Sequence, residues 1–338
     1  MMLSKALFFF PLLFFFYSNL LAKDGSAIAL IYHRFENNLY PSTSISQKNF
    51  YEQLQYLKEN NFNVLPITTL IDFFYNEKPL PKKSVFITVD DAYRSFYEYA
   101  FPILKEFNFP FSIFLSTNFV ARSENSDFMS WEMLREIKKN GGHIFNHSHK
   151  HNSFVKYSSE EIIEDVMLAD KIINENLGEI EKIISYPYGE SNKSVEQLIQ
   201  NLGYKIAFSQ HSSPIHFKEN RYNLPRFSIN DEYGQIKRFK QIVNLEPLIL
   251  NFFEILKSKK DNSSLEINFI PNLSSQNVNC FISDGVLNKV VVENFVKLKL
   301  TELNKNKRYR INCTAFENNK IYWFGKMVIK ENSAFKFY

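Results

Sequence analysis

The sequence predicts an α/β fold of parallel strands and helices, closed or partly closed into a barrel, followed by a smaller all-β domain. From Ala27 to Ser209, short β-branched or aromatic runs alternate with amphipathic stretches. This alternation is typical of parallel strands that are joined by helices. After about Asp261, strand-like runs separated by polar turns follow one another without a helical stretch, which favours an all-β sandwich.

The elements of the first part are defined by periodicity and by end signals. In the stretch 48–59, Phe50, Leu54 and Leu57 fall on one helical face. Ser158 and Glu161 have the spacing of a capping box before a long helix. We expect strands at 27–32, 85–89, 111–116, 183–186 and 205–209, and helices at 48–59, 97–107, 131–139, 159–176 and 195–202.

The second part contains both cysteines of the chain. Its expected strands are 265–270, 278–283, 289–300, 308–315, 321–329 and 334–338. The change of pattern near Lys257 to Ser264 divides the chain into a first domain at 23–260 and a β-rich accessory domain at 261–338. Cys280 and Cys313 either form a disulfide in an oxidising compartment or remain free, because their spacing alone does not fix the geometry.

The first 22 residues have the layout of a secretory signal peptide. Lys5 precedes the apolar run Ala6 to Tyr17, which is short for a membrane-spanning helix. We expect cleavage near Ala22 and export to the periplasm, the cell envelope or the medium. An uncleaved N-terminal anchor is the alternative, because Leu20 stands where a second small residue is usual.

The composition is that of a globular protein without a nucleic-acid surface. Hydrophobic residues make up 45% of the 338 residues, and aromatic residues make up 16%. Such a chain buries enough apolar surface to offset the entropy of ordering. The net charge is only +4, and no basic tract interleaved with aromatic residues is present, so nucleic acid is excluded as the expected partner.

A pair of carboxylates, Asp90 and Asp91, ends the expected strand at 85–89. Neighbouring side chains of a strand point to opposite faces, so both can enter one site only if the backbone leaves strand geometry here. Two carboxylates this close repel each other unless they share a cation or one of them binds a metal. The alternative is that the pair caps a helix or lies in a solvated turn.

Three histidines follow a predicted short strand, in the segment His147-Ser148-His149-Lys150-His151. His147 and His151 are four residues apart, which on a helical turn would put both rings on one side. Two imidazoles and one aspartate form a three-ligand zinc site that leaves room for water, the arrangement of catalytic sites. An adventitious surface cluster is the alternative for the histidines alone.

A third segment, Tyr186-Pro187-Tyr188-Gly189, follows the strand expected at 183–186. Proline fixes φ and glycine permits an unusual turn, so this loop can direct a backbone N–H inward. By itself the segment is an ordinary turn.

Together the three motifs resemble the NodB-type polysaccharide deacetylases, carbohydrate esterase family 4. Within this family they resemble the branch with a Tyr-Pro-Tyr-Gly loop, which includes enzymes that act on poly-N-acetylglucosamine. The resemblance covers about Ile28 to Ile229 and includes softer matches at Ile31-Tyr32-His33 and Leu224-Pro225-Arg226. It implies a distorted (β/α) barrel for the first domain, which agrees with the alternation of strands and helices.

The resemblance also implies roles for individual residues. Asp91, His147 and His151 would hold Zn²⁺, with Co²⁺ or Ni²⁺ also compatible, and Asp90 would be the base. The backbone N–H of Tyr188 would help the metal to stabilise the oxyanion.

Two positions depart from the family pattern. Many relatives have an arginine that positions the base before the Pro-Tyr-Gly segment, whereas Ser185 and Tyr186 stand here, and Arg226 is the candidate replacement. The late histidine that protonates the leaving amine is missing after Ile229. The remaining candidates for this acid are His33, His211, His216 or none, while His143 and His149 are expected to be bystanders.

The expected activity is therefore metal-dependent hydrolytic N-deacetylation of an N-acetylated amino-sugar polysaccharide. Peptidoglycan is the alternative substrate, and a catalytically silent carbohydrate-binding or assembly protein is the alternative of another class. The C-terminal domain is expected to bind glycan or an envelope or export partner, or to pack against the barrel.

Overall fold

A computed structural model describes residues 25–120, 126–257, 264–304, 307–331 and 334–337. The expected signal peptide at 1–22 lies outside the described residues. Within the described ranges, no helix is both long and apolar enough to cross a membrane.

The first part of the chain contains a curled, mainly parallel sheet. The strands run in the spatial order β10-β1-β5-β6-β7-β8-β9, and two short strands, β4 and β11, pair with β5 and β1. The longer strands fall where the sequence predicts them, including the short strand before the histidine motif, and their residues are almost all buried because helices cover the outer face. The strands are β1 (Ser26–Tyr32), β4 (Asn63–Val64), β5 (Ser84–Asp90), β6 (Ser112–Leu115), β7 (His143–Asn146), β8 (Ile183–Ser185), β9 (Ile206–Phe208), β10 (Ile215–His216) and β11 (Phe227–Ser228).

The segment 221–228 curls the sheet into a distorted barrel. Leu224 bridges Phe208 in parallel fashion, and Phe227 and Ser228 then pair with Leu30 and Ile31 of β1. The same short segment therefore contacts the last strand and the first. The predicted barrel is confirmed in this distorted form, and the carboxyl ends of β1, β5, β7 and β8 meet at one rim.

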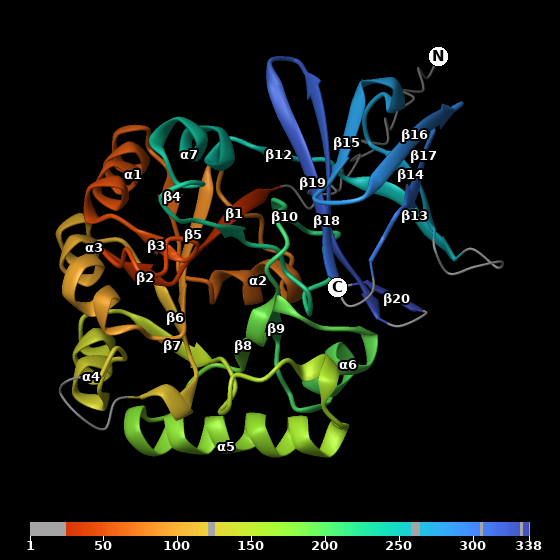
Figure 1. Cartoon of the computed structure of the whole chain (residues 1–338). Helices are drawn as coiled ribbons and strands as arrows, with labels where there is room; N and C mark the ends of the chain where they lie inside the picture. The colour runs from red at the N-terminus through yellow and green to blue at the C-terminus, as the bar shows by residue number, and fades with distance from the viewer. Residues whose placement is uncertain (1–24, 121–125, 258–263, 305–306, 332–333, 338) are drawn as a thin grey trace, which may run out of the picture.

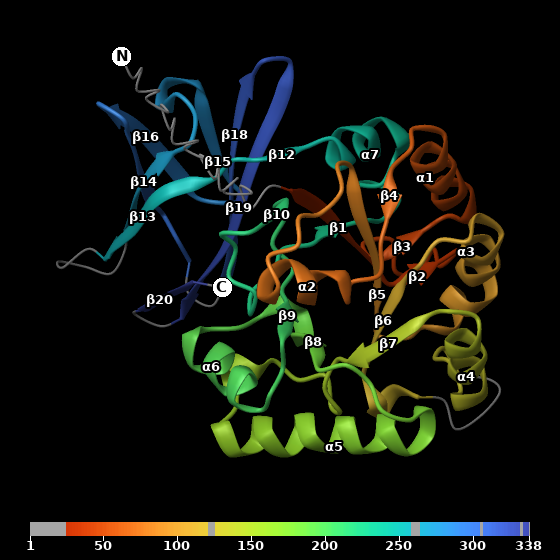
Figure 2. The ribbon, with the colours of Figure 1, turned by 180° about the vertical axis from the view of Figure 1, so that it is seen from behind.

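The helices surround the sheet, as Figures 1 and 2 show from opposite sides. α1, α3, α4 and α5 follow one another around the outer side of the barrel. The capping box of Ser158 and Glu161 is present at the start of α5. The helices are α1 (Gln47–Glu59), α2 (Thr69–Tyr75), α3 (Phe101–Phe107), α4 (Trp131–Lys139), α5 (Ser159–Leu177), α6 (Lys193–Asn201) and α7 (Ile236–Val243).

The helix expected at 97–107 is divided. A π-helical turn at Phe96–Ala100 precedes α3. Pro102 stands in the first turn of α3 and has no amide N–H to donate to the preceding turn. The regular ladder of hydrogen bonds is therefore interrupted where the sequence suggested one continuous helix.

The C-terminal part is a β-sandwich of two sheets, drawn from teal to blue in Figure 1, whose strands are antiparallel except for the parallel pair of β12 and β19. One sheet has the order β12-β19-β18-β15, with β20 beside β19, and the other has the order β13-β14-β17-β16. The run expected at 289–300 is two strands, because Glu293 takes a positive φ and turns the chain into a hairpin. The strands are β12 (Glu246–Pro247), β13 (Leu250–Lys257), β14 (Leu265–Pro271), β15 (Val278–Ile282), β16 (Val286–Val292), β17 (Phe295–Thr301), β18 (Lys307–Glu317), β19 (Lys320–Glu331) and β20 (Ala334–Phe337). In the first part, β2 (Arg34–Phe35) and β3 (Ser44–Ile45) form a separate two-stranded sheet.

Two strands that precede the expected boundary at 260 pair with strands that follow it. β13 pairs with β14 along its length, and β12 pairs with β19. A strand belongs to the sheet that supplies its hydrogen bonds, so we propose that the accessory domain begins near Glu246.

A disulfide joins Cys280 of β15 to Cys313 of β18. The two residues are direct cross-strand partners, and Cys313 is fully buried in the core of the sandwich. The disulfide alternative is therefore the one that the structure contains.

Candidate active site

The carboxyl end of β5 places two aspartates at the rim of the barrel. Asp90 is the last residue of the strand, and Asp91 has a φ of 70°. This left-handed backbone breaks the alternation of the strand, as the sequence analysis required, so that both side chains face one site. Both residues are buried.

The two histidines come together through a loop, and the helical turn suggested by their spacing is wrong. β7 ends at Asn146, and residues 147–151 are not helical. Ser148 and His151 have φ values of 70° and 55°, and these two left-handed positions fold the loop back. The ring centroids of His147 and His151 end 4.9 Å apart.

Asp91, His147 and His151 form one cluster. The Oδ1 atom of Asp91 lies 3.1 Å from Nε2 of His151 and 3.6 Å from Nε2 of His147. One ligand atom from each of the three residues falls within 4.8 Å of the others. The expected meeting of one carboxylate with two imidazoles is thus present in the structure.

The donor set of this cluster fits a divalent cation. Nδ1 of His147 lies 2.8 Å from the carbonyl oxygen of Ser185 and donates its proton there, so Nε2 presents a lone pair to the cluster. The buried Oδ1 of Asp91 receives no hydrogen bond. An unpaired buried carboxylate oxygen is costly, so the residues present fit a divalent cation, which would satisfy this oxygen.

Arg226 forms a buried ion pair with Asp90. The guanidinium donates from Nη1 to Oδ1 at 2.7 Å and from Nη2 to Oδ2 at 2.8 Å, a bidentate pair. It also donates to Ser209 O, Thr88 Oγ1 and Ser185 Oγ. Arg226 and Asp90 are both fully buried, so their relative position is fixed.

The charges of this cluster shift its pKa values. Burial alone would raise the pKa of Asp90, but Arg226 and His147 outweigh it and hold that pKa below its usual range. Burial would also raise the pKa of Asp91, while His151, His33 and His147 hold it well below its usual range. Burial lowers the pKa of His147 to about 4. The aspartates are therefore ionised and His147 is neutral at neutral pH, which is the state that binds a metal.

The Tyr186-to-Gly189 loop borders the cluster. Tyr188 has φ 61° and ψ 6°, a left-handed conformation, and its ring lies 4.7 Å from the ring of His151. Gly189 also has a positive φ, and a Cβ there would come within 2.5 Å of Gln210. Only glycine fits this position, which keeps Tyr188 beside the histidine.

The three candidate acids differ in position. His33, at the end of β1, lines the cavity that also contains Asp91, His151 and Tyr188. His216 instead pairs with Glu219 at 3.1 Å, and His211 is 2% exposed and is not among the residues that line this cavity. The expected bystander His149 is held by Thr117, whose Oγ1 lies 2.8 Å from Nδ1 of the ring.

Several supporting residues escaped the sequence analysis. Oδ1 of Asn146 accepts the N–H of Ser148 at 2.6 Å, and its Nδ2 donates to Asp170 of α5. Asp165, also in α5, accepts the N–H groups of His149 and Lys150. The place of Asn146, directly before the histidine motif, was a signal that could have identified it. Asp165 gave no such signal, because it resembles any polar residue of an amphipathic helix.

Comparisons with known proteins agree with this geometry. The polysaccharide deacetylase family matches residues 77–207. A poly-beta-1,6-N-acetyl-D-glucosamine N-deacetylase of Staphylococcus aureus is 33% identical over 237 residues, covering 62% of this chain and 81% of the relative. The enzyme of the same name from Staphylococcus epidermidis is 26% identical over 237 residues, again with 62% and 81% covered.

Solved structures share the fold of the barrel. The Streptococcus pyogenes deacetylase PplD in complex with acetate has a TM-score of 0.60 at 20% identity, covering 66% of this chain and 99% of that one. IcaB from Ammonifex degensii has a TM-score of 0.57 at 21% identity, with 65% and 97% covered.

Proposed function

The chain belongs to the polysaccharide deacetylase family of hydrolases, and we propose that it removes acetyl groups from the N-acetylglucosamine units of a β-1,6-linked polysaccharide. The observation that carries the proposal is the convergence of Asp91, His147 and His151 with Asp90 beside them. The 33% identity to an enzyme named for that polymer supports the choice of substrate.

We assign Asp91, His147 and His151 as the ligands of a divalent metal ion, with Zn²⁺ as the proposed ion. Two imidazoles and one carboxylate suit zinc and also suit Co²⁺ or Ni²⁺. These residues would hold the ion, and the ion would supply Lewis acidity toward the acetamide carbonyl and toward a water molecule. The carbonyl of Ser185 orients His147 for this task through Nδ1.

Asp90 is the proposed general base. It takes a proton from the water whose oxygen attacks the carbonyl carbon of the acetamide. Oδ2 of Asp90 lies 3.7 Å from Nε2 of His147, so the base stands next to the ligands. Both of its oxygens accept hydrogen bonds from Arg226, which favours the role of a base over that of a ligand. Arg226 keeps the carboxylate ionised and oriented through two hydrogen bonds.

The remaining charges are assigned to residues that line the same cavity. The backbone N–H of Tyr188 is the proposed partner of the oxyanion. His33 is the proposed donor of the proton that the amine takes up when the carbon–nitrogen bond breaks. The products are acetate and a glucosamine unit of the polymer.

We further propose that residues 1–22 direct export and that the enzyme acts in the periplasm or at the cell envelope. The exported glycan is the partner of the site. Peptidoglycan is the alternative substrate, and the assay below compares it with the β-1,6-linked polymer. An export-machinery partner for the β-sandwich is a separate part of this proposal.

Acetate release tests the function. Wild type and Asp90→Asn are each incubated with β-1,6-linked N-acetylglucosamine oligomers and with peptidoglycan, with and without added Zn²⁺. We expect release from the oligomers only, dependent on metal, and about 10²–10⁴-fold slower in the variant. Equal rates for the two proteins would remove Asp90 from the mechanism. No release by a wild-type protein of measured zinc content would favour a silent binding protein.

A further inference from the structure

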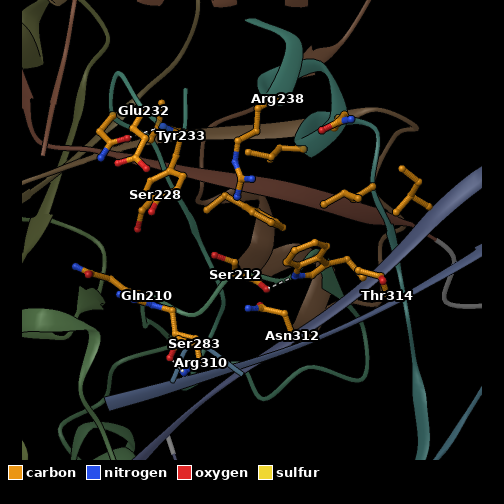
Figure 3. A pocket seen from close by; sticks show the side chains of 18 of the residues that line it. Gln210, Ser212, Ser228, Glu232, Tyr233, Arg238, Ser283, Arg310, Asn312 and Thr314 are labelled. Atoms are coloured by element: carbon orange, nitrogen blue, oxygen red, sulfur yellow. Dashed lines mark hydrogen bonds between the residues drawn. The ribbon is translucent and has the colours of Figure 1, made fainter. Parts of the chain in front are cut away.

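The metal cluster opens into a cavity of about 1460 Å³ that has two walls from distant parts of the chain. One wall belongs to the barrel and includes His33, Asp91, His151 and Tyr188. The other belongs to β15, β18 and β19 of the sandwich. Figure 3 shows Arg310 and Asn312 of this second wall facing the same space as Arg238 and Ser228 of the barrel.

The second wall is one face of β18. Every second residue of this strand lines the cavity, and the intervening residues lie in the core of the sandwich. A strand has this two-faced pattern when each face contacts a different environment. We call the cavity-facing residues the β18 stripe: Arg308, Arg310, Asn312, Thr314 and Phe316.

The stripe is attached to the catalytic loop. Nη1 of Arg308 donates to the carbonyl oxygen of Tyr188 at 3.3 Å, and its Nε lies 3.5 Å from Oε1 of Glu190. Tyr188 is the residue proposed to contact the oxyanion. The stripe therefore begins beside the reacting centre.

A second junction fixes the other end of the wall. Nε1 of Trp323 in β19 donates to the carbonyl oxygen of Ser212 at 2.7 Å, the dashed line in Figure 3. Gly325 approaches the same carbonyl so closely that a Cβ would lie 1.9 Å from its oxygen. The two walls are thus held at a defined separation.

The dimensions of the stripe suit a polymer. At about 3.3 Å per residue, Arg308 and Phe316 are about 26 Å apart along the strand. This length exceeds that of a single sugar and accommodates several consecutive units. A site for the reacting unit alone would not need it.

The chemistry of the cavity favours uncharged sugars. Amide and hydroxyl groups of Asn312, Asn279 and Thr314 can pair with the hydroxyl and acetamide groups of a glycan. Trp323 and the exposed Phe316 offer aromatic surface.

Charge in the same cavity disfavours an amine. Among the described lining residues outside the metal cluster, Arg238, Arg308 and Arg310 are positively charged and Glu232 is negatively charged. Arg308 is already paired with Glu190, so two arginines face one acid. Burial lowers the pKa of Arg310, and the positive charge of Arg308 contributes to the same shift. A protonated glucosamine would be repelled here.

We propose that the β18 stripe binds N-acetylated sugar units next to the unit that reacts at the metal cluster, so that the sandwich is a specificity-determining wall of the enzyme. This inference rests on the proposed function. It assigns the accessory domain to substrate selection along the same polymer chain.

Chain-length dependence tests the proposal. The value of kcat/KM is measured for a dimer and a hexamer of β-1,6-linked N-acetylglucosamine. Wild type should prefer the hexamer by tenfold or more, and Arg310→Ala combined with Asn312→Ala should reduce this ratio at least fivefold. Phe316→Ala, at a site 64% exposed, should act in the same direction without risk to the fold. Lys299→Ala, at an exposed position of β17 in the other sheet, is the matched control and should keep the wild-type ratio.

Calorimetric binding separates this proposal from the catalytic one. The hexamer is titrated into wild type and the same variants without turnover, in metal-free buffer. Tenfold weaker binding by the stripe variants, together with weaker binding of the fully deacetylated hexamer by wild type, supports the proposal even if no acetate is released. Unchanged binding in both stripe variants would overturn it, and equal or tighter binding of the deacetylated hexamer would overturn the preference for acetylated units.

Discussion

In the barrel, four ionisable side chains are buried at the strand ends, whereas in the β-sandwich the charged side chains lie on the surface around an apolar core. Asp90, Asp91, His147 and Arg226 are each no more than 7% exposed. The core of the sandwich consists of aliphatic and aromatic residues with the disulfide. Arg308 and Arg310 lie on its exposed face.

This difference indicates a division of labour between the two regions. Reactive groups need burial and paired charges to acquire shifted pKa values, and the rim of the barrel supplies both. A binding wall needs a regular, solvent-facing row of side chains, which a strand supplies without buried charge. The following predictions test whether the two regions behave in these separate ways.

The largest expected effect is at the metal cluster. His151→Ala removes one of three ligands, and we expect activity to fall about 10³-fold, because loss of an ion that stabilises charge costs several kcal/mol of barrier. The variant should also lose bound metal, which elemental analysis measures. His149→Ala, two residues away, is the control. Normal activity in a metal-free His151→Ala protein would contradict the assignment.

The next effect is at Arg226. Arg226→Lys retains the positive charge but loses the bidentate grip on Asp90, so we expect kcat to fall about 10²-fold with little change in KM. Arg221→Lys, whose guanidinium stacks on Tyr75, should keep wild-type kcat. If the two variants had equal kcat, the role of Arg226 in positioning the base would be excluded.

A smaller effect should be confined to the sandwich. The double variant Cys280→Ser and Cys313→Ser removes a cross-link between residues 33 positions apart. We expect the free energy of unfolding to fall by about 2–4 kcal/mol. Chemical denaturation should show an earlier transition for the sandwich. Metal content at the barrel should remain that of wild type in the native range. A matching loss of bound metal would show that the two regions do not behave separately.

The smallest effect is expected at His211, where the barrel meets β19. Burial, together with the charge of Lys326 and against that of Glu219, lowers the pKa of His211 to about 3. Since the unfolded chain has a histidine pKa near 6.5, it binds more protons than the folded chain between these values. Folding stability should therefore fall as the pH decreases below 6.5, by about 1 kcal/mol per pH unit.

Urea unfolding at pH 6 and pH 5 measures this slope. His211→Gln should reduce it relative to wild type, while His149→Gln should not. An identical slope in all three proteins would exclude protonation of His211 as a source of acid sensitivity.

Local patterns allowed much of the barrel to be predicted from the sequence. Strand β5 and its terminal aspartates were recognisable because an apolar run ends directly in Asp90 and Asp91. The proximity of His147 and His151 was predicted correctly, but the predicted helical backbone was wrong. The spacing of a helical turn does not reveal that two residues of the loop are left-handed.

Long-range contacts were harder to predict. Arg226 lies 136 residues from Asp90 in the sequence and could be proposed only through family resemblance. Nothing in the sequence indicated that Arg308 would reach Tyr188, because that contact depends on how two separately folded regions pack. The turn at Glu293 was missed because glutamate rarely adopts a positive φ.

The pairing of β12 with β19 has a consequence for the order in which the enzyme is assembled. Glu246 and Pro247 follow α7 directly, yet their strand partners Tyr322 and Trp323 are among the later residues to be synthesised. The metal ligands can therefore be in place while half of the surrounding cavity is still absent. A nascent or shortened chain would then contain the proposed metal ligands but lack the β18 stripe that is proposed to select the polymer.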